Sequence, residues 1–373
     1  MTETSPPSKT GKETSAPVQA MVVGTSDVVA GLVSSILERD PRIEIAATPA
    51  DGAEAVIQFR KVDIEAVVLD IGGDPKEALT SISRLKRIDT KVQIIMVSTL
   101  NFTNVKTGIE GIERGAAEFL QTPARHTKDS SLAVFQHNLA ETVHGLGLAR
   151  RPAGGPVAKK VPDLTPARPI RLRKESQLAP KILLIGSSTG GPQALHAVFK
   201  TLSKSVTQPI LIAQHMPPVF TAALAKTITD KSGWACKEGE DGEVIQGGHV
   251  YIAPGDKHMV IEKDGGETVI RLNQDPPVNY CRPSVDPLFR SAVKIFGAAT
   301  LAAVLTGMGN DGEAAAGVIA EAGGTVIAQD EATSVVWGMP GAVAVAGVCS
   351  AVLPLGDIAG YLNQAAGGKY GAK

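Results

Sequence analysis

The sequence predicts an α/β protein of two doubly wound, mainly parallel-sheet domains joined by a linker. Three observations carry this prediction. Apolar, strand-like runs alternate with helical segments in both halves of the chain, which is typical of βα units and parallel sheets. The 373 residues are enough for two ordinary domains, and 43% of them are hydrophobic. Near residues 150 to 180, prolines, glycines and basic residues replace the periodic pattern.

The composition divides the chain into four expected segments. Residues 1–17 are polar and proline-bearing, with no apolar signal-peptide region, and we expect a disordered tail there. Domains are expected over 18–148 and 181–366, separated by a Pro/basic linker over 149–180. The linker is either a tether without a binding role or a docking segment.

Five βα units are expected in the first domain. The first helix, 27–40, begins at Ser26 or Asp27, the next covers 51–62, and a closing helix covers 137–149. This repetition is typical of a flavodoxin-like doubly wound sheet. The expected strands are 18–24, 43–48, 66–70, 92–98 and 116–120.

The second domain opens with a candidate nucleophile, Ser188. An apolar run from residue 181 ends in Gly186-Ser187-Ser188-Thr189-Gly190, and a helical segment follows. This matches G-x-S-x-G where a strand turns sharply into a helix and exposes the serine hydroxyl. The alternative is a Ser/Thr helix cap in a glycine-rich turn.

A candidate base follows at the end of a second apolar run. His215 closes the segment 209–215, and two prolines then stop the strand. Alone, such a histidine is more often a satisfied polar group than a base. His196 is expected inside the helix after the serine turn, and a surface role is favoured for His249 and His258.

A third apolar run, 300–306, leads into a glycine-rich loop that carries Asp311. Ser188, His215 and Asp311 thus each follow the carboxyl end of a strand, at the edge where parallel α/β sheets build their sites. Their order differs from the Ser, acid, His order of α/β-hydrolases. A triad is defined by geometry, so the order argues against that fold and not against the chemistry.

The chemistry that these residues predict is acyl transfer. His215 would take the proton of Ser188, and Asp311 would orient and stabilise the imidazole. Backbone N–H groups would hold the oxyanion, and we expect those of Thr189 and Met308 to do so.

The loop 307–312 also has a competing interpretation as the dinucleotide fingerprint G-x-G-x-x-G, with Asp330 about 20 residues further on. Two points count against it. Asp311 would place a carboxylate beside the pyrophosphate at a helix N-terminus, and the motif comes too late to open a two-half Rossmann sheet. It also leaves Ser188 and His215 without a role.

The second domain contains five motifs in this order: IGSSTGGPQAL, AQHMPPVFT, RPSVDPLF, LTGMGNDG and QDEATSVVWGMP. They resemble the C-terminal domain of the chemotaxis protein-glutamate methylesterases, the CheB family, which implies a Rossmann-like methylesterase domain. The family's triad falls on Ser188, His215 and Asp311. The resemblance implies hydrolysis of γ-glutamyl methyl esters on chemoreceptor cytoplasmic helices, with release of methanol, and deamidation of certain receptor glutamines at the same site.

The phrases AVVLDI, DGAEAV and RGAAEFL in the first domain look like a response-regulator receiver, which the family carries at its N-terminus. Asp70 matches the phosphoacceptor position, Ser98 the hydroxyl position and Phe119 the aromatic position.

The rest of the receiver site departs from the family pattern. Gly24-Thr25 stands where a receiver has two acids for Mg²⁺, and Thr122-Pro123 stands where it has lysine-proline. Mg²⁺ needs carboxylate ligands, and the lysine neutralises the acyl phosphate. We therefore predict a degenerate receiver, with a vestigial Asp70 favoured over a working phosphoacceptor.

Composition excludes several other classes. The net charge of −1 argues against a nucleic-acid partner. The three cysteines, Cys236, Cys281 and Cys349, are widely spaced, so we expect free thiols, no metal site and no cofactor. No apolar stretch reaches membrane-spanning length, which predicts a cytoplasmic protein without membrane insertion.

The predicted partners are methylated chemoreceptor cytoplasmic domains, with a chemotaxis histidine kinase as a second candidate. One alternative is a non-catalytic signalling adaptor that docks on chemoreceptors, and another is a general esterase or amidase for small molecules. An intact Ser188, His215 and Asp311 set speaks against the adaptor, since packing alone does not demand all three.

Overall fold

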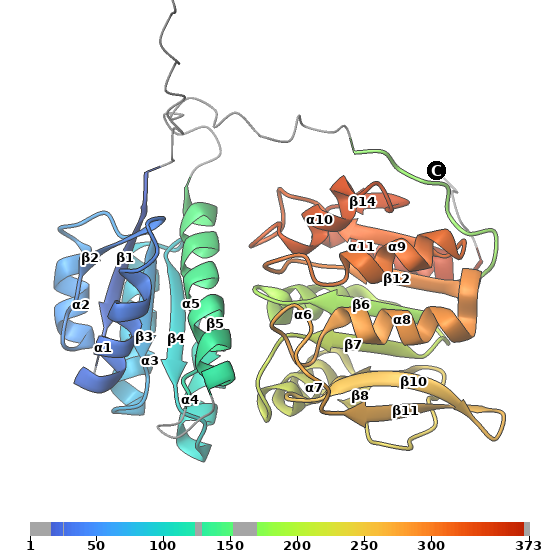
Figure 1. Cartoon of the computed structure of the whole chain (residues 1–373), viewed down its shortest axis with the longest axis horizontal. Helices are drawn as coiled ribbons and strands as arrows, with labels where there is room; N and C mark the ends of the chain where they lie inside the picture. Colours follow the sequence, from blue (N-terminus) through green and yellow to red (C-terminus); the bar gives the residue numbers. More distant parts are fainter. Residues whose placement is uncertain (1–15, 25, 124–128, 152–169, 369–373) are drawn as a thin grey trace, which may run out of the picture.

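The computed structural model describes residues 16–24, 26–123, 129–151 and 170–368. The expected tail up to residue 15, Thr25 and most of the linker lie outside these residues. The chain forms two α/β modules that stand side by side (Figure 1). No described helix is long and apolar enough to cross a membrane.

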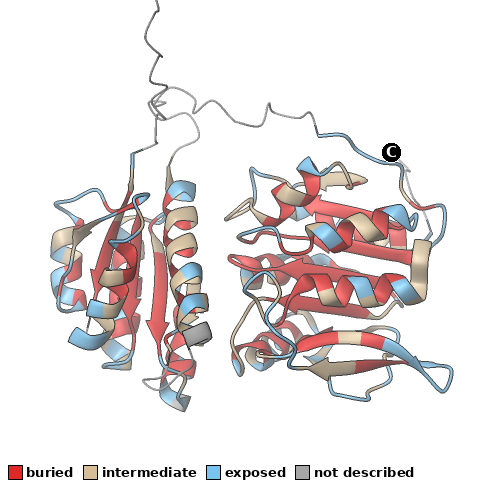
Figure 2. Cartoon of the chain, viewed as in Figure 1, coloured by how far each residue is buried: buried red, intermediate tan, exposed pale blue. Residues whose placement is uncertain are grey.

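The first module is a five-stranded parallel sheet in the order β2-β1-β3-β4-β5, the flavodoxin-like order. Successive residues of the strands point to opposite faces and pack in two separate cores, so both faces of the sheet are buried (Figure 2). One core lies under α1 (Asp27–Leu37) and α5 (Asp129–Arg150), and the other under α2 (Gly52–Phe59), α3 (Pro75–Ile88) and α4 (Phe102–Glu113). The strands are β1 (Val18–Val23), β2 (Ile43–Ala47), β3 (Ala66–Asp70), β4 (Gln93–Ser98) and β5 (Glu118–Gln121).

The second module is a seven-stranded parallel sheet in the order β14-β13-β12-β6-β7-β9-β8, with an antiparallel hairpin of β10 and β11 beside it. Its strands are β6 (Ile182–Ser187), β7 (Ile210–Gln214), β8 (Ala235–Glu238), β9 (His249–Ile252), β10 (His258–Asp264), β11 (Glu267–Asn273), β12 (Thr300–Val304), β13 (Thr325–Gln329) and β14 (Ala351–Leu353). The predicted fold class is confirmed.

Helices cover both faces of this second sheet. The core on one face includes residues of α6 (Gly191–Thr201), α7 (Phe220–Ser232) and α11 (Leu355–Ala366). The core on the other includes residues of α8 (Val285–Phe296), α9 (Glu313–Glu321) and α10 (Met339–Val345). A short 3₁₀ turn, η1 (Gly297–Ala299), joins α8 to β12.

The order of the strands fixes where a site can form. The chain runs from β6 outward to β7, β9 and β8, and later returns to β12 on the other side of β6. The direction of winding therefore reverses between β6 and β12. At such a switch point the connections diverge and leave a crevice outside the carboxyl ends of the strands.

Several element bounds and one burial expectation from the sequence need correction. Helix α5 begins at Asp129, before the expected 137, and β5 begins at Glu118 and not at 116. Helices α1 and α2 end at Leu37 and Phe59, before the expected 40 and 62. His258 is not a surface residue, because only 1% of it is exposed. The hairpin packs under α8, where the ring of His258 contacts the Pro276 carbonyl at 3.2 Å and accepts the Ser284 N–H at 3.2 Å.

Candidate active site

Ser188 is held in a sharp turn directly after β6. Its N–H donates to the Thr306 carbonyl at 3.0 Å, which ties the turn to the end of β12. Gly190 has a φ of 77°, a left-handed conformation that glycine adopts without a steric penalty. Position 307 also requires glycine, since a Cβ there would lie 2.9 Å from the Ser188 Cβ. The turn therefore places Ser188 at the switch point.

His215 lies beside Ser188 because β6 and β7 are paired in register. Ser187 stands opposite Gln214, so the next residues, Ser188 and His215, emerge together at the carboxyl edge. The His215 N–H donates to the Ser187 carbonyl at 3.1 Å. The Gln214 side chain adds a second tie, because its amide donates to the carbonyls of Ser188 at 2.9 Å and of His215 at 3.2 Å.

Asp311 is buried in the loop after β12 and lies 2.8 Å from the imidazole, Oδ2 to His215 Nε2. Both carboxylate oxygens accept further hydrogen bonds. Oδ2 accepts the N–H of Val285 at 2.7 Å, and Oδ1 accepts from the Ser284 hydroxyl at 2.8 Å. An acceptor with this many donors is held as a carboxylate and cannot turn away from the ring.

The two groups shift each other's pKa. Burial alone would raise the pKa of Asp311, but the hydrogen bond and charge of His215 outweigh it and lower the value to about 2. Burial likewise opposes protonation of His215, yet the neighbouring Cys281 and the Asp311 carboxylate raise its pKa well above the ordinary 6.5. The carboxylate of Asp311 therefore stabilises the protonated form of His215.

Two contacts to this pair come from a turn that the sequence reasoning missed. Asn279 donates its side-chain amide to Asp311 Oδ1 at 2.9 Å. Cys281 Sγ lies 3.2 Å from the other ring nitrogen of His215, Nδ1. Asn279 lies 32 positions from Asp311, and Cys281 lies 66 positions from His215. No periodicity or motif spacing connects either pair.

The predicted oxyanion donors flank the serine. Thr189 follows Ser188 in the turn, and Met308 lies in the loop after β12 next to Gly307. Within the described part of the chain, the N–H groups of Thr189 and Met308 donate to no recorded acceptor. Ser188 Oγ likewise makes no recorded hydrogen bond to the His215 ring among the described residues.

Comparison with known proteins identifies the family. The CheB methylesterase family model matches residues 183–362. A protein-glutamate methylesterase/protein-glutamine glutaminase 1 of Rhodospirillum rubrum is 47% identical over 369 residues, which cover 94% of this chain and 95% of that protein. A relative in Azospirillum brasilense, with the same name but for the final number, is 42% identical and covers 96% of both chains.

This chain belongs to the CheB family. The predicted resemblance is confirmed over nearly the whole chain, including the N-terminal receiver. Among solved structures, the Thermotoga maritima CheB methylesterase catalytic domain is 42% identical with a TM-score of 0.49, and the match covers 50% of this chain and 99% of that one. The degeneracy of the receiver stays a prediction.

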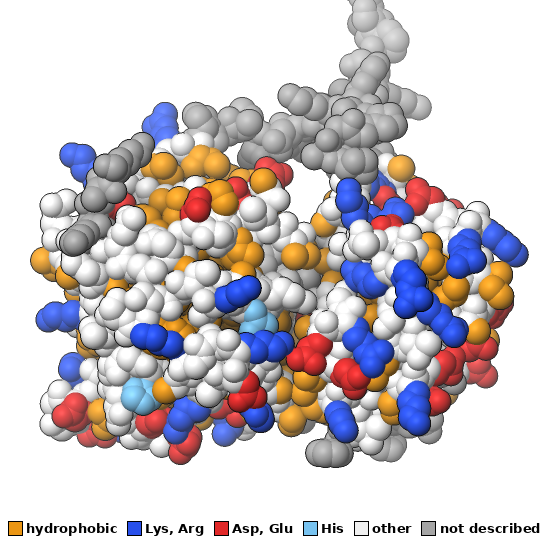
Figure 3. Space-filling view, turned by 180° about the vertical axis from the view of Figure 1, so that it is seen from behind, with side chains coloured by type: hydrophobic (Ala, Val, Ile, Leu, Met, Phe, Trp, Pro, Cys, Tyr) orange, Lys and Arg blue, Asp and Glu red, His pale blue; other side chains and the backbone are white. Residues whose placement is uncertain are grey.

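The receiver of this CheB protein contacts the edge of the sheet that carries Ser188. Phe119 of β5 stacks on Phe220 of α7 with ring centroids 4.5 Å apart, and Phe220 is 1% exposed. His137 of α5 stacks on Tyr280 at 4.1 Å. The view from behind shows side chains of the two halves meeting along the lower part of the seam (Figure 3). Ser188 itself is only 8% exposed.

Glu118 of β5 interacts with two residues of the candidate site, Thr189 and His215. Burial raises the pKa of its carboxyl from 4.5 to about 7, although a hydrogen bond with the Thr189 side chain and the charge of His215 act in the opposite direction. The same strand thus supplies both an apolar contact, Phe119, and a titratable group beside a predicted oxyanion donor.

The receiver's own site contains the expected residues at the ends of β3 and β4. Asp70 is 2% exposed and accepts the N–H of Gly72 at 2.9 Å. The Ser98 hydroxyl accepts from the Asn104 amide at 2.7 Å. Thr122, which the sequence analysis matches to the receiver lysine, has a buried hydroxyl without a hydrogen-bond partner among the described residues.

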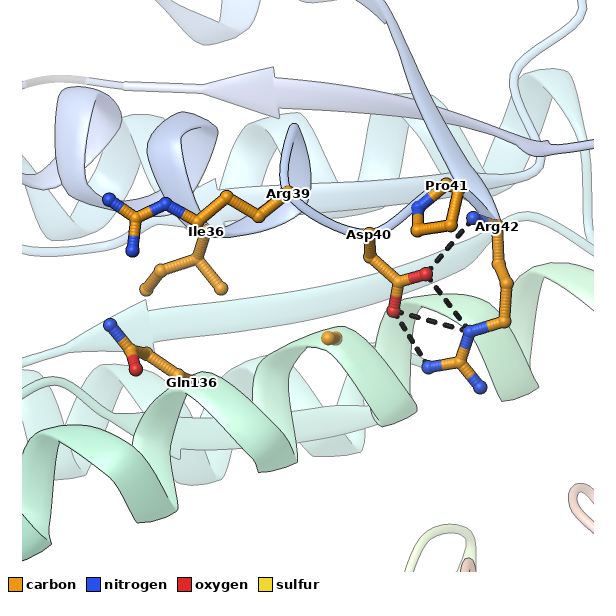
Figure 4. A pocket seen from close by; sticks show the side chains of 7 residues that line it. Ile36, Arg39, Asp40, Pro41, Arg42 and Gln136 are labelled. Carbon is orange, nitrogen blue, oxygen red and sulfur yellow. Dashed lines mark hydrogen bonds and ion pairs between the residues drawn. The ribbon is translucent and has the colours of Figure 1, made fainter.

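A hollow elsewhere on the receiver does not belong to either site. It lies between α1 and α5, where Ile36, Arg39 and Gln136 line it and an Asp40–Arg42 ion pair closes one end (Figure 4). Among the described residues, no group of three or more histidine, cysteine or acidic side chains is placed to hold a metal ion.

Proposed function

We propose that this CheB protein is a serine hydrolase that removes methyl esters from the glutamyl side chains of chemoreceptors during chemotaxis adaptation. We include deamidation of receptor glutamines, because the relatives are named as both methylesterases and glutaminases. The observation that carries the proposal is the position of Ser188 beside the hydrogen-bonded His215–Asp311 pair at the switch point of the sheet.

We assign each residue of the proposed triad a step. Nε2 of His215 is bonded to Asp311, so Nδ1 is the nitrogen that takes the proton when Ser188 Oγ attacks the ester carbonyl. The N–H groups of Thr189 and Met308 hold the oxyanion. The tetrahedral intermediate collapses as His215 returns the proton to the departing methoxide, which leaves as methanol.

A water molecule completes the cycle. His215 takes its proton as it attacks the acyl-enzyme, and the second collapse restores Ser188 and releases a glutamate carboxylate. With a glutamine side chain, ammonia leaves in place of methanol and the second half is identical. Asp311 stabilises the imidazolium in both halves, as its low pKa and the raised pKa of His215 favour.

We assign the chemistry to residues 181–366 and regulation to residues 18–148, in a cytoplasmic protein. The contacts of Phe119, Glu118 and His137 hold the receiver over the serine, so a receptor helix can enter only when these contacts open. A chemotaxis histidine kinase is a candidate partner for the receiver. An adaptor would bind receptors without needing the His215–Asp311 pair.

The test is methanol release from methylated receptor membranes. Ser188→Ala and His215→Ala should each lose roughly 10⁴-fold or more in rate, and the double variant should be little worse, because the two act as one unit. Ser205→Ala, in an exposed turn, is the matched control and should keep the wild-type rate. Unchanged turnover in a folded Ser188→Ala protein would eliminate the serine mechanism.

A further inference from the structure

The imidazole of His215 is contacted by a thiol as well as by a carboxylate. Cys281 Sγ lies 3.2 Å from Nδ1, and Asp311 Oδ2 lies 2.8 Å from Nε2. Cys281 is therefore not an isolated thiol. It stands at the end of a Cys–His–Asp chain, the arrangement in which an imidazole removes a thiol proton and leaves the nucleophilic thiolate.

The position of this thiol is fixed by its turn. Val278 and Cys281 exchange both backbone hydrogen bonds, at 3.1 and 2.9 Å, and the two residues between them have positive φ, 52° at Asn279 and 61° at Tyr280. Such a conformation persists in non-glycine residues only when contacts hold it. The Asn279 amide on Asp311 and the Tyr280 ring on His137 are those contacts.

The other two cysteines provide an internal comparison. Burial raises the pKa of Cys236 and of Cys349 to about 12, so their thiolate fractions at neutral pH are negligible. Cys236 and Cys281 are both partly exposed, and the feature that distinguishes Cys281 is its contact with the His215 imidazole.

We infer that Cys281 is a modification site for small soft electrophiles, namely peroxides and haloacetamides, and that its modification stops the esterase. With hydrogen peroxide, His215 takes the thiol proton and the sulfur attacks one peroxide oxygen. The S–O bond forms as the O–O bond breaks, and the departing hydroxide takes the proton from His215 to become water. The sulfur is oxidised to the sulfenic acid and the peroxide is reduced.

With iodoacetamide, the S–C bond forms as the C–I bond breaks, iodide leaves and the proton passes to the buffer. Either product places new atoms on a sulfur that is 3.2 Å from Nδ1. This is the nitrogen that must accept the proton of Ser188, so the loss of activity rests on the proposed function, whereas the reactivity of the thiol does not.

The first measurement follows labelling alone. Full-length protein is treated with limiting iodoacetamide, and the modified peptides are quantified by mass spectrometry over time. Cys281 should react about ten-fold or more faster than Cys236 and Cys349, and His215→Gln should slow its labelling by about ten-fold while leaving the other two unchanged. Equal labelling of the three cysteines, or no effect of His215→Gln, would overturn the activation of this thiol.

The second measurement follows methanol release, expressed as a fraction of each variant's own untreated rate. Wild type should lose activity in proportion to Cys281 labelling, with iodoacetamide and with peroxide, and Cys281→Ala should keep its rate under the same treatment. Loss of activity in Cys281→Ala, or full activity in fully labelled wild type, would refute the block at His215. Failure of the serine mechanism would be recognised separately, as unchanged turnover in Ser188→Ala.

Discussion

Replacement of Asp311 by asparagine separates the charge of this residue from its hydrogen bonds. The amide can keep its oxygen at the Oδ2 position, where the Val285 N–H and His215 Nε2 both require an acceptor. Its NH₂ group then meets the Ser284 hydroxyl and the Asn279 amide, which can both turn to accept. The backbone N–H of Asp286, which donates to Oδ1 at 3.3 Å, cannot turn and loses this long hydrogen bond. The imidazole therefore keeps its tautomer and its acceptor at Nε2, and it loses the carboxylate charge.

The size of the effect follows from that lost charge. A hydrogen bond to a charged group contributes about 1.5–3 kcal/mol, and two unit charges 4 Å apart attract by about 4 kcal/mol at an effective dielectric constant of 20. Removal of roughly 1.5 to 4 kcal/mol from the stabilisation of the imidazolium corresponds to a ten-fold to thousand-fold fall in kcat/KM. Asp311→Asn should thus retain far more activity than His215→Ala.

The pH profile distinguishes this explanation from misfolding. In wild type the pKa of His215 is raised well above 6.5. The neutral base forms only as the pH passes this raised pKa, and activity should rise over the same range. Without the carboxylate, one of the two groups that raise this pKa is lost while burial still lowers it, so the midpoint should move to lower pH. The assay is the initial rate of methanol release between pH 5 and 10, with thermal melting to verify folding. An unchanged midpoint, or a loss equal to that of His215→Ala, would refute the reasoning.

Three other outcomes are expected. Full-length protein given Mg²⁺ and a small phosphodonor should be stimulated weakly or not at all. A several-fold stimulation that Asp70→Ala lacks would restore Asp70 as a working phosphoacceptor. The pKa of Glu118 is raised where the receiver contacts the catalytic half, so the neutral carboxyl stabilises that contact. This stabilisation is complete below pH 4.5 and is lost as the pH rises through about 7. The rate of wild type relative to Glu118→Gln, which cannot ionise, should therefore increase between pH 5 and 8, and a constant ratio would contradict this role for Glu118. EDTA should leave methanol release unchanged, and a loss that zinc reverses would contradict the triad.

The sequence predicts the framework well because buried parallel strands are continuous apolar runs that end in turn residues. Ser188 and His215 could be placed together in this way, since each follows such a run directly. The contacts of Asn279 and Cys281 could not, because a turn with two positive φ values and no glycine carries no local signal. The surface role expected for His258 was wrong for the same reason, since burial under α8 is a tertiary contact.

Phe220 has a further practical consequence. It is the first residue of α7 in the catalytic half, but its ring packs within the core of the receiver, against Phe119 and so close to Gly108 that a Cβ there would lie 2.7 Å from it. Exposing a phenylalanine side chain to water costs about 1.5–3 kcal/mol. A catalytic fragment beginning at Lys181 would display this ring on its surface, so we expect it to self-associate. A polar substitution at Phe220 is the first change to make when producing such a fragment.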